Sequence, residues 1–185
     1  RLTRQAGQHL CEEIQGIPDT VRRVLDQDGA IAEIAKSFRH VNDCFYIGRG
    51  YMYPVALEGA LKLKEISYIH AEGYHAAELK HGPIALIEEN VPVVAMMCDL
   101  PGYEKVISNV HECRARGATV VGIATEGDEN ADGVADHLIR IPRTSRYVAP
   151  VPAAVALQLL AYHVARLRGC SIDQPRNLAK SVTVE

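Results

Sequence analysis

The chain has 185 residues, of which 48% are hydrophobic and 23% charged, and its formal net charge is −3. This length allows one domain with a substantial buried core, and this composition excludes a disordered tail. The charge gives no basic surface for nucleic acid or for an acidic membrane, and no apolar run approaches the ~18–20 residues of a spanning helix. We therefore expect no nucleic-acid partner and no membrane segment.

The N-terminus and the cysteines bear on the cellular setting. The first ten residues lack the apolar core of a secretory signal, and the chain begins at Arg1 rather than at Met, so we expect a fragment of a longer protein. The five cysteines are an odd number without a C-x-x-C pair, which argues against a disulfide framework and a zinc ribbon. A reduced, cytoplasmic setting is predicted.

The expected elements alternate along the chain. Helical spacing dominates the first 40 residues, which Pro18 and Gly29 interrupt. Beyond them, strands are expected at 44–47, 91–97, 119–124 and 137–141, and helices at 53–69, 103–116 and 151–167. Continuously apolar strands that alternate with helices predict a parallel sheet covered on both faces. The predicted fold is α/β, a three-layer α/β/α sandwich with a mostly parallel, doubly wound sheet and N-terminal helices.

The most informative stretch is ALEGALKLKE, residues 56–65. On a helix, Glu58, Lys62 and Glu65 fall at roughly 0°, 40° and −20°, and so share one narrow stripe. Such a stripe could be a surface Glu–Lys pair, worth about 0.3–0.5 kcal/mol. It could instead be functional, because the helix starts at the carboxyl edge of the sheet, where open α/β folds bind ligands. A lysine there could hold a neighbouring carboxylate ionised and orient it as a base.

Two motifs that invite a cofactor or a metal do not fit their templates. The run Gly48-Arg49-Gly50 lacks the third glycine of G-x-G-x-x-G, so no nicotinamide cofactor is expected and a tight strand-to-helix turn explains the glycines. The histidines at 70, 75 and 81 are spaced by five and six residues, unlike an H-E-x-x-H pair, so no metal site is predicted.

One histidine and one lysine have no clear role when each is taken alone. His81 lies in K-H-G-P, a loop-like setting that leaves the imidazole accessible, but a loop histidine is more often a solvated side chain. Lys180 lies close to the C-terminus, where a lysine is ordinarily a frayed solvent charge. Spacing and composition give neither residue a function.

Two stretches resemble a known family. The run from Gly48 to Pro83, with GALKLKEISYIHAEGYHAAELKHGP, and the terminus DQPRNLAKSVTVE are similar to the second sugar-isomerase (SIS) module of glutamine–fructose-6-phosphate transaminases, the glucosamine-6-phosphate synthases. The terminal run is the more specific, since related SIS domains of other functions do not end this way. The resemblance implies a helical linker at 1–42, an SIS domain at 43–169 and a C-terminal active-site tail at 170–185.

The resemblance also implies roles for residues. The family converts fructose 6-phosphate and glutamine into glucosamine 6-phosphate and glutamate, and we expect no cofactor. Glu65 matches the base that moves a proton between C1 and C2, and Lys180 matches the lysine that forms a Schiff base with the ketose carbonyl. His81 matches the ring-opening histidine, which reaches the site from the neighbouring subunit, so a homodimer is expected. The residues that match supporting positions of the same site are Glu58, Lys62 and Ala179.

The resemblance finally indicates which domains of the family have no match in this sequence. One is the glutaminase domain with its N-terminal cysteine nucleophile. The other is the first SIS module, whose Ser/Thr-rich loops hold the sugar phosphate. With these domains as its partners, the fragment is expected to be inactive alone and to bind hexose phosphates weakly. The alternative is a stand-alone regulatory SIS domain, which would need phosphate-binding loops but neither Glu65 nor Lys180.

Overall fold

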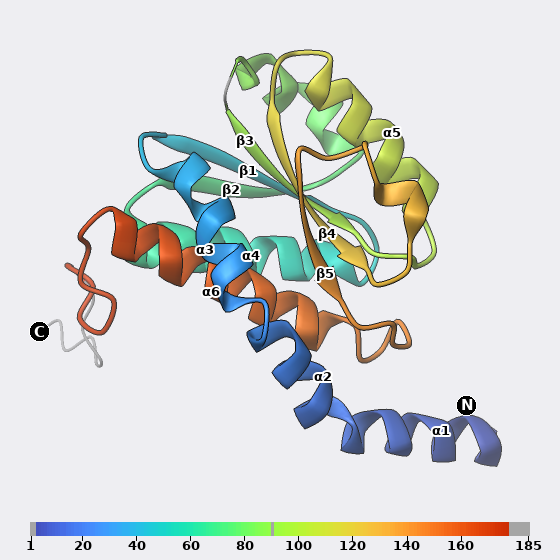
Figure 1. The fold of residues 1–185 in the computed structure, drawn as a ribbon. Coiled ribbons are helices and arrows are strands. Elements are labelled where there is room, and N and C mark those ends of the chain that lie inside the picture. Colours follow the sequence, from blue (N-terminus) through green and yellow to red (C-terminus); the bar gives the residue numbers. More distant parts are fainter. Residues whose placement is uncertain (1–2, 90, 178–185) are drawn as a thin grey trace, which may run out of the picture.

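A computed structural model of the chain describes residues 3–89 and 91–177. In this part of the chain five parallel strands form one sheet in the order β2-β1-β3-β4-β5 (Figure 1). The strands are β1 (Asp43–Gly48), β2 (His70–His75), β3 (Pro92–Met97), β4 (Thr119–Thr125) and β5 (His137–Ile141). The predicted α/β fold with a parallel sheet is confirmed.

Helices cover both faces of the sheet, as Figure 1 shows. One face carries α4 (Met52–Ser67) and α6 (Pro150–Leu167), and α2 (Ile17–Leu25) and α3 (Asp28–Ala35) pack on α6. The other face carries α5 (Tyr103–Arg114) and the short 3₁₀ helices η2 (Glu78–His81) and η3 (Pro83–Leu86). The remaining elements are α1 (Arg4–Gln15), η1 (Lys36–Phe38) and η4 (Glu129–Ala131). We call these two sides the α4 face and the α5 face.

The apolar strands are continuous because both faces are covered. In β1, Cys44 and Tyr46 are buried in the core under α4 and α6, whereas Phe45 and Ile47 are buried in the core under α5. Successive side chains of a strand point to opposite faces, so a central strand of a three-layer fold needs apolar residues at every position. All six residues of β3 are buried for the same reason.

The edge strand β2 was not among the expected strands. Its sequence, HAEGYH, is polar, and Ala71 is its only fully buried residue. The strand pairs along its whole length with β1, from Asp43 opposite His70 to Gly48 opposite His75. A side chain at Gly73 would come within 2.9 Å of the Leu57 backbone, so α4 packs directly on this strand. Backbone pairing and close helix packing, rather than apolar periodicity, specify β2.

The N-terminal helices α2 and α3 belong to the same core as α4 and α6. Val24, Ile31 and Phe38 are each at most 1% exposed within it, whereas none of the residues of α1 is buried. A side-chain contact of 2.7 Å joins His163 Nε2 on α6 to Asp28 Oδ1 at the start of α3. In the described residues no helix is long and apolar enough to cross a membrane.

Candidate active site

The stripe predicted on α4 is present. Lys62 Nζ lies 2.6 Å from Glu65 Oε2 and 4.0 Å from Glu58 Oε1. The three side chains are 33%, 31% and 42% exposed, respectively, so each is partly shielded and partly open to solvent. The inward side of the helix, with Gly59 and Leu63, is buried against the core. Helical periodicity thus separates one charged stripe from one packed face.

The two carboxylates of this stripe both favour the charged form of Lys62. The hydrogen bond to Glu65 raises the pKa of Lys62 above its ordinary value, partial burial opposes this, and the charges of Glu65 and Glu58 add to the increase. Lys62 is therefore an ammonium throughout the neutral range, fixed beside the Glu65 carboxylate. The contact fixes the orientation of the Glu65 carboxylate, as a group that accepts a proton requires.

The stripe was expected at the carboxyl edge of the sheet, but it lies toward the opposite edge. Helix α4 begins at the carboxyl edge, just after Gly48, and runs antiparallel to the strands. Glu65 follows Met52 by thirteen residues, which is about 20 Å along the helix axis. Soon after the helix ends, His70 pairs with Asp43, the first residue of β1. The rule for the edge of an α/β sheet applies to the start of a helix, whereas the stripe runs from Glu58 in the middle of α4 to Glu65 near its end.

The glycines before α4 have a structural role. A side chain at Gly48 would come within 2.4 Å of the Met52 carbonyl oxygen, and Gly50 has a φ of 52°. Both positions belong to the tight turn that leads from β1 into α4, as predicted. Between them, Arg49 donates a hydrogen bond of 3.0 Å to Asn109 Oδ1 on α5.

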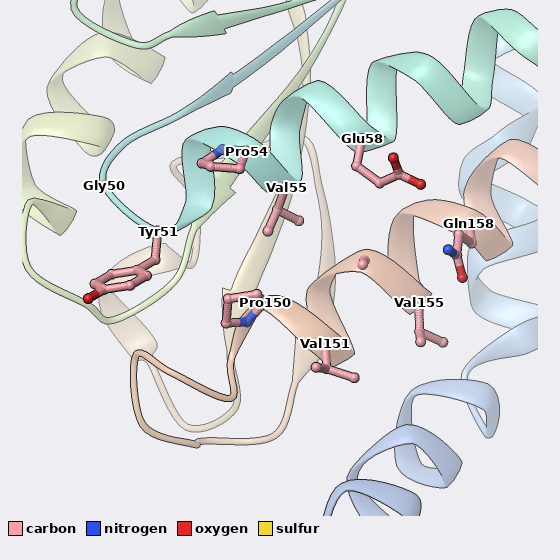
Figure 2. Close-up of a pocket in the computed structure, with 10 residues that line it drawn as sticks. Gly50, Tyr51, Pro54, Val55, Glu58, Pro150, Val151, Val155 and Gln158 are labelled. Atoms are coloured by element: carbon pink, nitrogen blue, oxygen red, sulfur yellow. The ribbon is translucent and has the colours of Figure 1, made fainter. Parts of the chain in front are cut away.

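An apolar groove continues the charged stripe toward the start of α4. It has a volume of about 760 Å³ and lies between the first halves of α4 and α6. Figure 2 shows Tyr51 at one end and Glu58 and Gln158 at the other. Val55 and Val151 line its apolar middle. Glu58 is therefore shared between the groove and the stripe, and the α4 face presents an apolar and a charged surface side by side.

His81 ends the 3₁₀ helix η2, and its side chain is 71% exposed. Its Nδ1 lies 3.8 Å from Glu78 Oε2, and the neighbouring Lys80 is tied to Glu112 on α5 at 2.7 Å. Because η2 packs on the α5 face, the sheet stands between His81 and the stripe on α4. Within this one chain the structure does not bring His81 and Glu65 together.

The predicted residues Ala179 and Lys180 lie outside the described residues. The tail is described as far as Asn177 and passes the end of α4. There the backbone N–H of Arg176 donates to the Tyr68 hydroxyl at 2.9 Å, and the Arg176 guanidinium lies 4.0 Å from the centre of the Tyr68 ring. Sequence reasoning missed this contact, because no local pattern links two residues that are 108 positions apart.

At the carboxyl edge of the sheet, polar groups bind one another. Asp99 pairs with Arg143, and the Asp99 N–H donates to Thr125 Oγ1 at 2.9 Å. Arg140 pairs with Asp132 and donates to the Asp128 carbonyl oxygen at 2.7 Å. Within residues 3–89 and 91–177, no three His, Cys, Asp or Glu side chains are grouped as metal ligands.

Comparison with known proteins agrees with this fold. The SIS domain family model matches residues 37–168, which is more than half of the chain. The chain belongs to the SIS domain family. A solved structure, the C-terminal domain of glucosamine-fructose-6-phosphate aminotransferase from Francisella tularensis, is 38% identical with a TM-score of 0.89, and the match covers 94% of this chain and 49% of that one.

Relatives of known name are also similar over nearly the whole chain. A glutamine–fructose-6-phosphate aminotransferase (isomerizing) from Chlorobaculum tepidum is 54% identical over 94% of this chain, and one from Thermus thermophilus is 50% identical over all of it. The matches cover only 28% and 30% of those proteins. This SIS domain thus spans less than a third of the length of the relatives that it matches.

Proposed function

We propose that this chain is the second SIS module of a glutamine–fructose-6-phosphate aminotransferase and supplies the residues for its ketose–aldose isomerisation. The observation that carries the proposal is the Lys62–Glu65 pair, at 2.6 Å on a chain about half identical to aminotransferases of that name. An isolated surface pair of this kind contributes little to stability. A carboxylate held in place by a lysine is instead suited to moving a proton next to a carbonyl or imine carbon.

The chemistry assigns one step to each residue. The amine of Lys180 adds to the C2 carbonyl of open-chain fructose 6-phosphate, and water leaves as the Schiff base forms. Ammonia released from glutamine then adds to C2, and the Lys180 amine leaves, so that the new nitrogen stays on C2 as an imine. Glu65 takes the proton from C1 and returns it to C2, while the C1 hydroxyl loses its proton and becomes the aldehyde, so the overall products are glucosamine 6-phosphate and glutamate. Lys62 orients the Glu65 carboxylate, Glu58 holds Lys62 from its other side, and Ala179 lies beside Lys180 in the sequence.

The positions of His81 and Glu65 support a homodimer as part of this proposal. The two side chains belong to opposite faces of the sheet, so one site can use both only if a neighbouring subunit supplies one of them. His81 is largely exposed, as a residue that acts in another chain would be. A two-fold axis would then complete two equivalent sites at once.

The chain supplies part of a site rather than a whole one. We assign a helical linker to residues 1–42, the SIS domain to 43–169 and an active-site tail to 170–185. The glutaminase domain and the first SIS module of a full-length enzyme would be its partners. They would add ammonia and the phosphate-binding loops. Alone, the chain would be inactive and would bind fructose 6-phosphate weakly. We place the full-length enzyme in the cytoplasm, where its cysteines would be free, as they are in the described residues.

The test uses a full-length enzyme that contains this chain. Lys180→Ala and Glu65→Gln should each lower glucosamine 6-phosphate formation by at least about a hundredfold, because each removes a group that touches the reacting carbons. Glutamine hydrolysis should be retained in both variants. Near-normal synthesis in both would reject the proposal, and Glu65 and Lys180 would then be ordinary surface charges. A regulatory SIS domain would show saturable sugar-phosphate binding that both variants preserve.

A further inference from the structure

The residue that caps the C-terminus of α4, before the chain turns back into the sheet, has an unusual conformation. Tyr68 has φ 61° and ψ 16°, in the left-handed region, while its N–H still bonds the Lys64 carbonyl oxygen at 3.2 Å. Glycine closes helices in this conformation with least strain, and a bulky aromatic residue adopts it rarely. The contacts of its side chain can offset the cost of this conformation.

The Tyr68 side chain holds the C-terminal tail at two points. Its hydroxyl oxygen accepts the backbone N–H of Arg176 at 2.9 Å, and its ring lies 4.0 Å from the Arg176 guanidinium. The first contact fixes the backbone of the tail, and the second fixes a side chain above the ring. Together they set both the position and the direction of the chain at residue 176.

Neighbouring contacts make this corner of the molecule rigid. Arg168, just after α6, donates to the carbonyl oxygens of Ser67 at 3.2 Å and Val41 at 3.0 Å. The Cys170 N–H then returns to the Ala165 carbonyl oxygen at 3.0 Å, which closes the end of α6. The tail therefore leaves from a fixed point that joins the ends of α4 and α6 to the start of β1.

We propose that Tyr68 is a positioning residue for Lys180, an inference that rests on the proposed function. Tyr68 follows Glu65 by three residues, about 4.5 Å along the helix axis. Lys180 follows Arg176 by four residues, at most ~14 Å of extended chain. With residue 176 fixed on Tyr68, this length of chain limits how far Lys180 can lie from the end of α4. Such restriction raises the rate of a reaction between two groups without contact to the substrate.

The experiment compares Tyr68→Phe and Tyr68→Leu in the full-length enzyme. The phenylalanine variant loses the hydrogen bond and keeps the ring, so kcat for glucosamine 6-phosphate synthesis should fall about three- to tenfold. The leucine variant loses both contacts, and its kcat for synthesis should fall about ten- to a hundredfold. Borohydride trapping of fructose 6-phosphate on Lys180, measured by mass spectrometry, should slow in parallel. The KM for fructose 6-phosphate and glutamine hydrolysis should change less than about threefold, because the contact orders a reacting group and not the bound sugar.

A matched control exists on α6. The Arg166 guanidinium lies 5.8 Å from the centre of the Tyr162 ring, so Tyr162→Leu removes a tyrosine–arginine contact elsewhere and should leave synthesis unchanged. Hydrogen–deuterium exchange should become faster in peptides that cover residues 170–177 in the Tyr68 variants, and not in the Tyr162 variant. If Tyr68→Leu does not fold, Arg176→Ala removes the stacking contact from the other side and should show the same slower trapping.

Two results would overturn the proposal. Unchanged exchange in the tail of the Tyr68 variants would mean that the contact does not hold the tail. Faster exchange with synthesis within twofold of the unmodified enzyme would mean that holding the tail has no catalytic consequence. Failure of the proposed function looks different, because the unmodified enzyme would then give no trapped adduct on Lys180 at all.

Discussion

A lysine–glutamate pair on the α4 face and one on the α5 face of this sheet have nearly equal lengths. On α4, Lys62 and Glu65 are 2.6 Å apart, and on the other face Lys80 and Glu112 are 2.7 Å apart. The first pair adjoins a second carboxylate, an apolar groove and the tail that leads to Lys180. The second pair fastens η2, with His81 at its end, onto α5.

A short ion pair does not by itself mark a functional site. What distinguishes the α4 pair is its surroundings, since a second carboxylate, an apolar groove and the Tyr68–Arg176 contact lie near it. What distinguishes the α5 pair is that it carries an exposed histidine on the far side of the sheet. The comparison therefore predicts a site shared between two chains, in which the α4 face of one subunit meets η2 of the other.

The largest expected effect comes from mixing two inactive enzymes. Glu65→Gln and His81→Ala should each lower synthesis in the full-length homodimer by about a hundredfold or more. In mixed dimers, one of the two sites combines the intact Glu65 of one subunit with the intact His81 of the other. Random exchange of subunits should therefore restore about a quarter of the original activity.

The absence of recovery in the same mixing experiment would place both residues of a site in one chain. Mass spectrometry of the intact dimers must show that subunits have exchanged, and two Glu65→Gln enzymes carrying different tags serve as the control. Recovery in that control would reveal contamination rather than complementation.

The next effect separates the α4 pair from an ordinary helical pair. Lys62→Met removes the ammonium beside Glu65 and should lower kcat for synthesis about ten- to a hundredfold, because the base loses its orientation and its charge partner. Lys36→Met is the matched control, since Lys36 and Glu33 form a pair of the same spacing at 2.5 Å. That change should leave kcat unaltered. Equal kcat values for the two variants would mean that Lys62 and Glu65 form an ordinary surface pair.

The sequence predicts most of the fold for physical reasons that can be named. Strand β3, PVVAMM, is buried on both faces and therefore reads as an uninterrupted apolar run. The edge strand β2 was not predicted, because only one side of it is paired and its residues are largely polar. Its Gly73 marks the close approach of Leu57, but a lone glycine in a polar run also fits a loop.

The candidate site was predictable only in part, and again for physical reasons. Periodicity alone places Glu58, Lys62 and Glu65 on one stripe, because the helix is regular. Their distance from the carboxyl edge depends on the return direction of α4, which the edge rule does not include. The Tyr68–Arg176 contact joins distant segments and depends on a left-handed residue at a helix end, which no local pattern specifies.

The smallest expected effect concerns the pair on the α5 face. Lys80→Met removes the bond to Glu112, a pair whose side chains are 51% and 29% exposed, so the free energy of unfolding should fall by at most about 1 kcal/mol. Synthesis should change by less than about threefold, since η2 keeps its buried anchor at Leu79 and His81 therefore keeps its place at the end of η2. Urea denaturation and steady-state kinetics measure both quantities. A loss as large as that of Lys62→Met would mean that the α5 face contributes a charged group to the chemistry itself, and the contrast between the two faces would no longer hold.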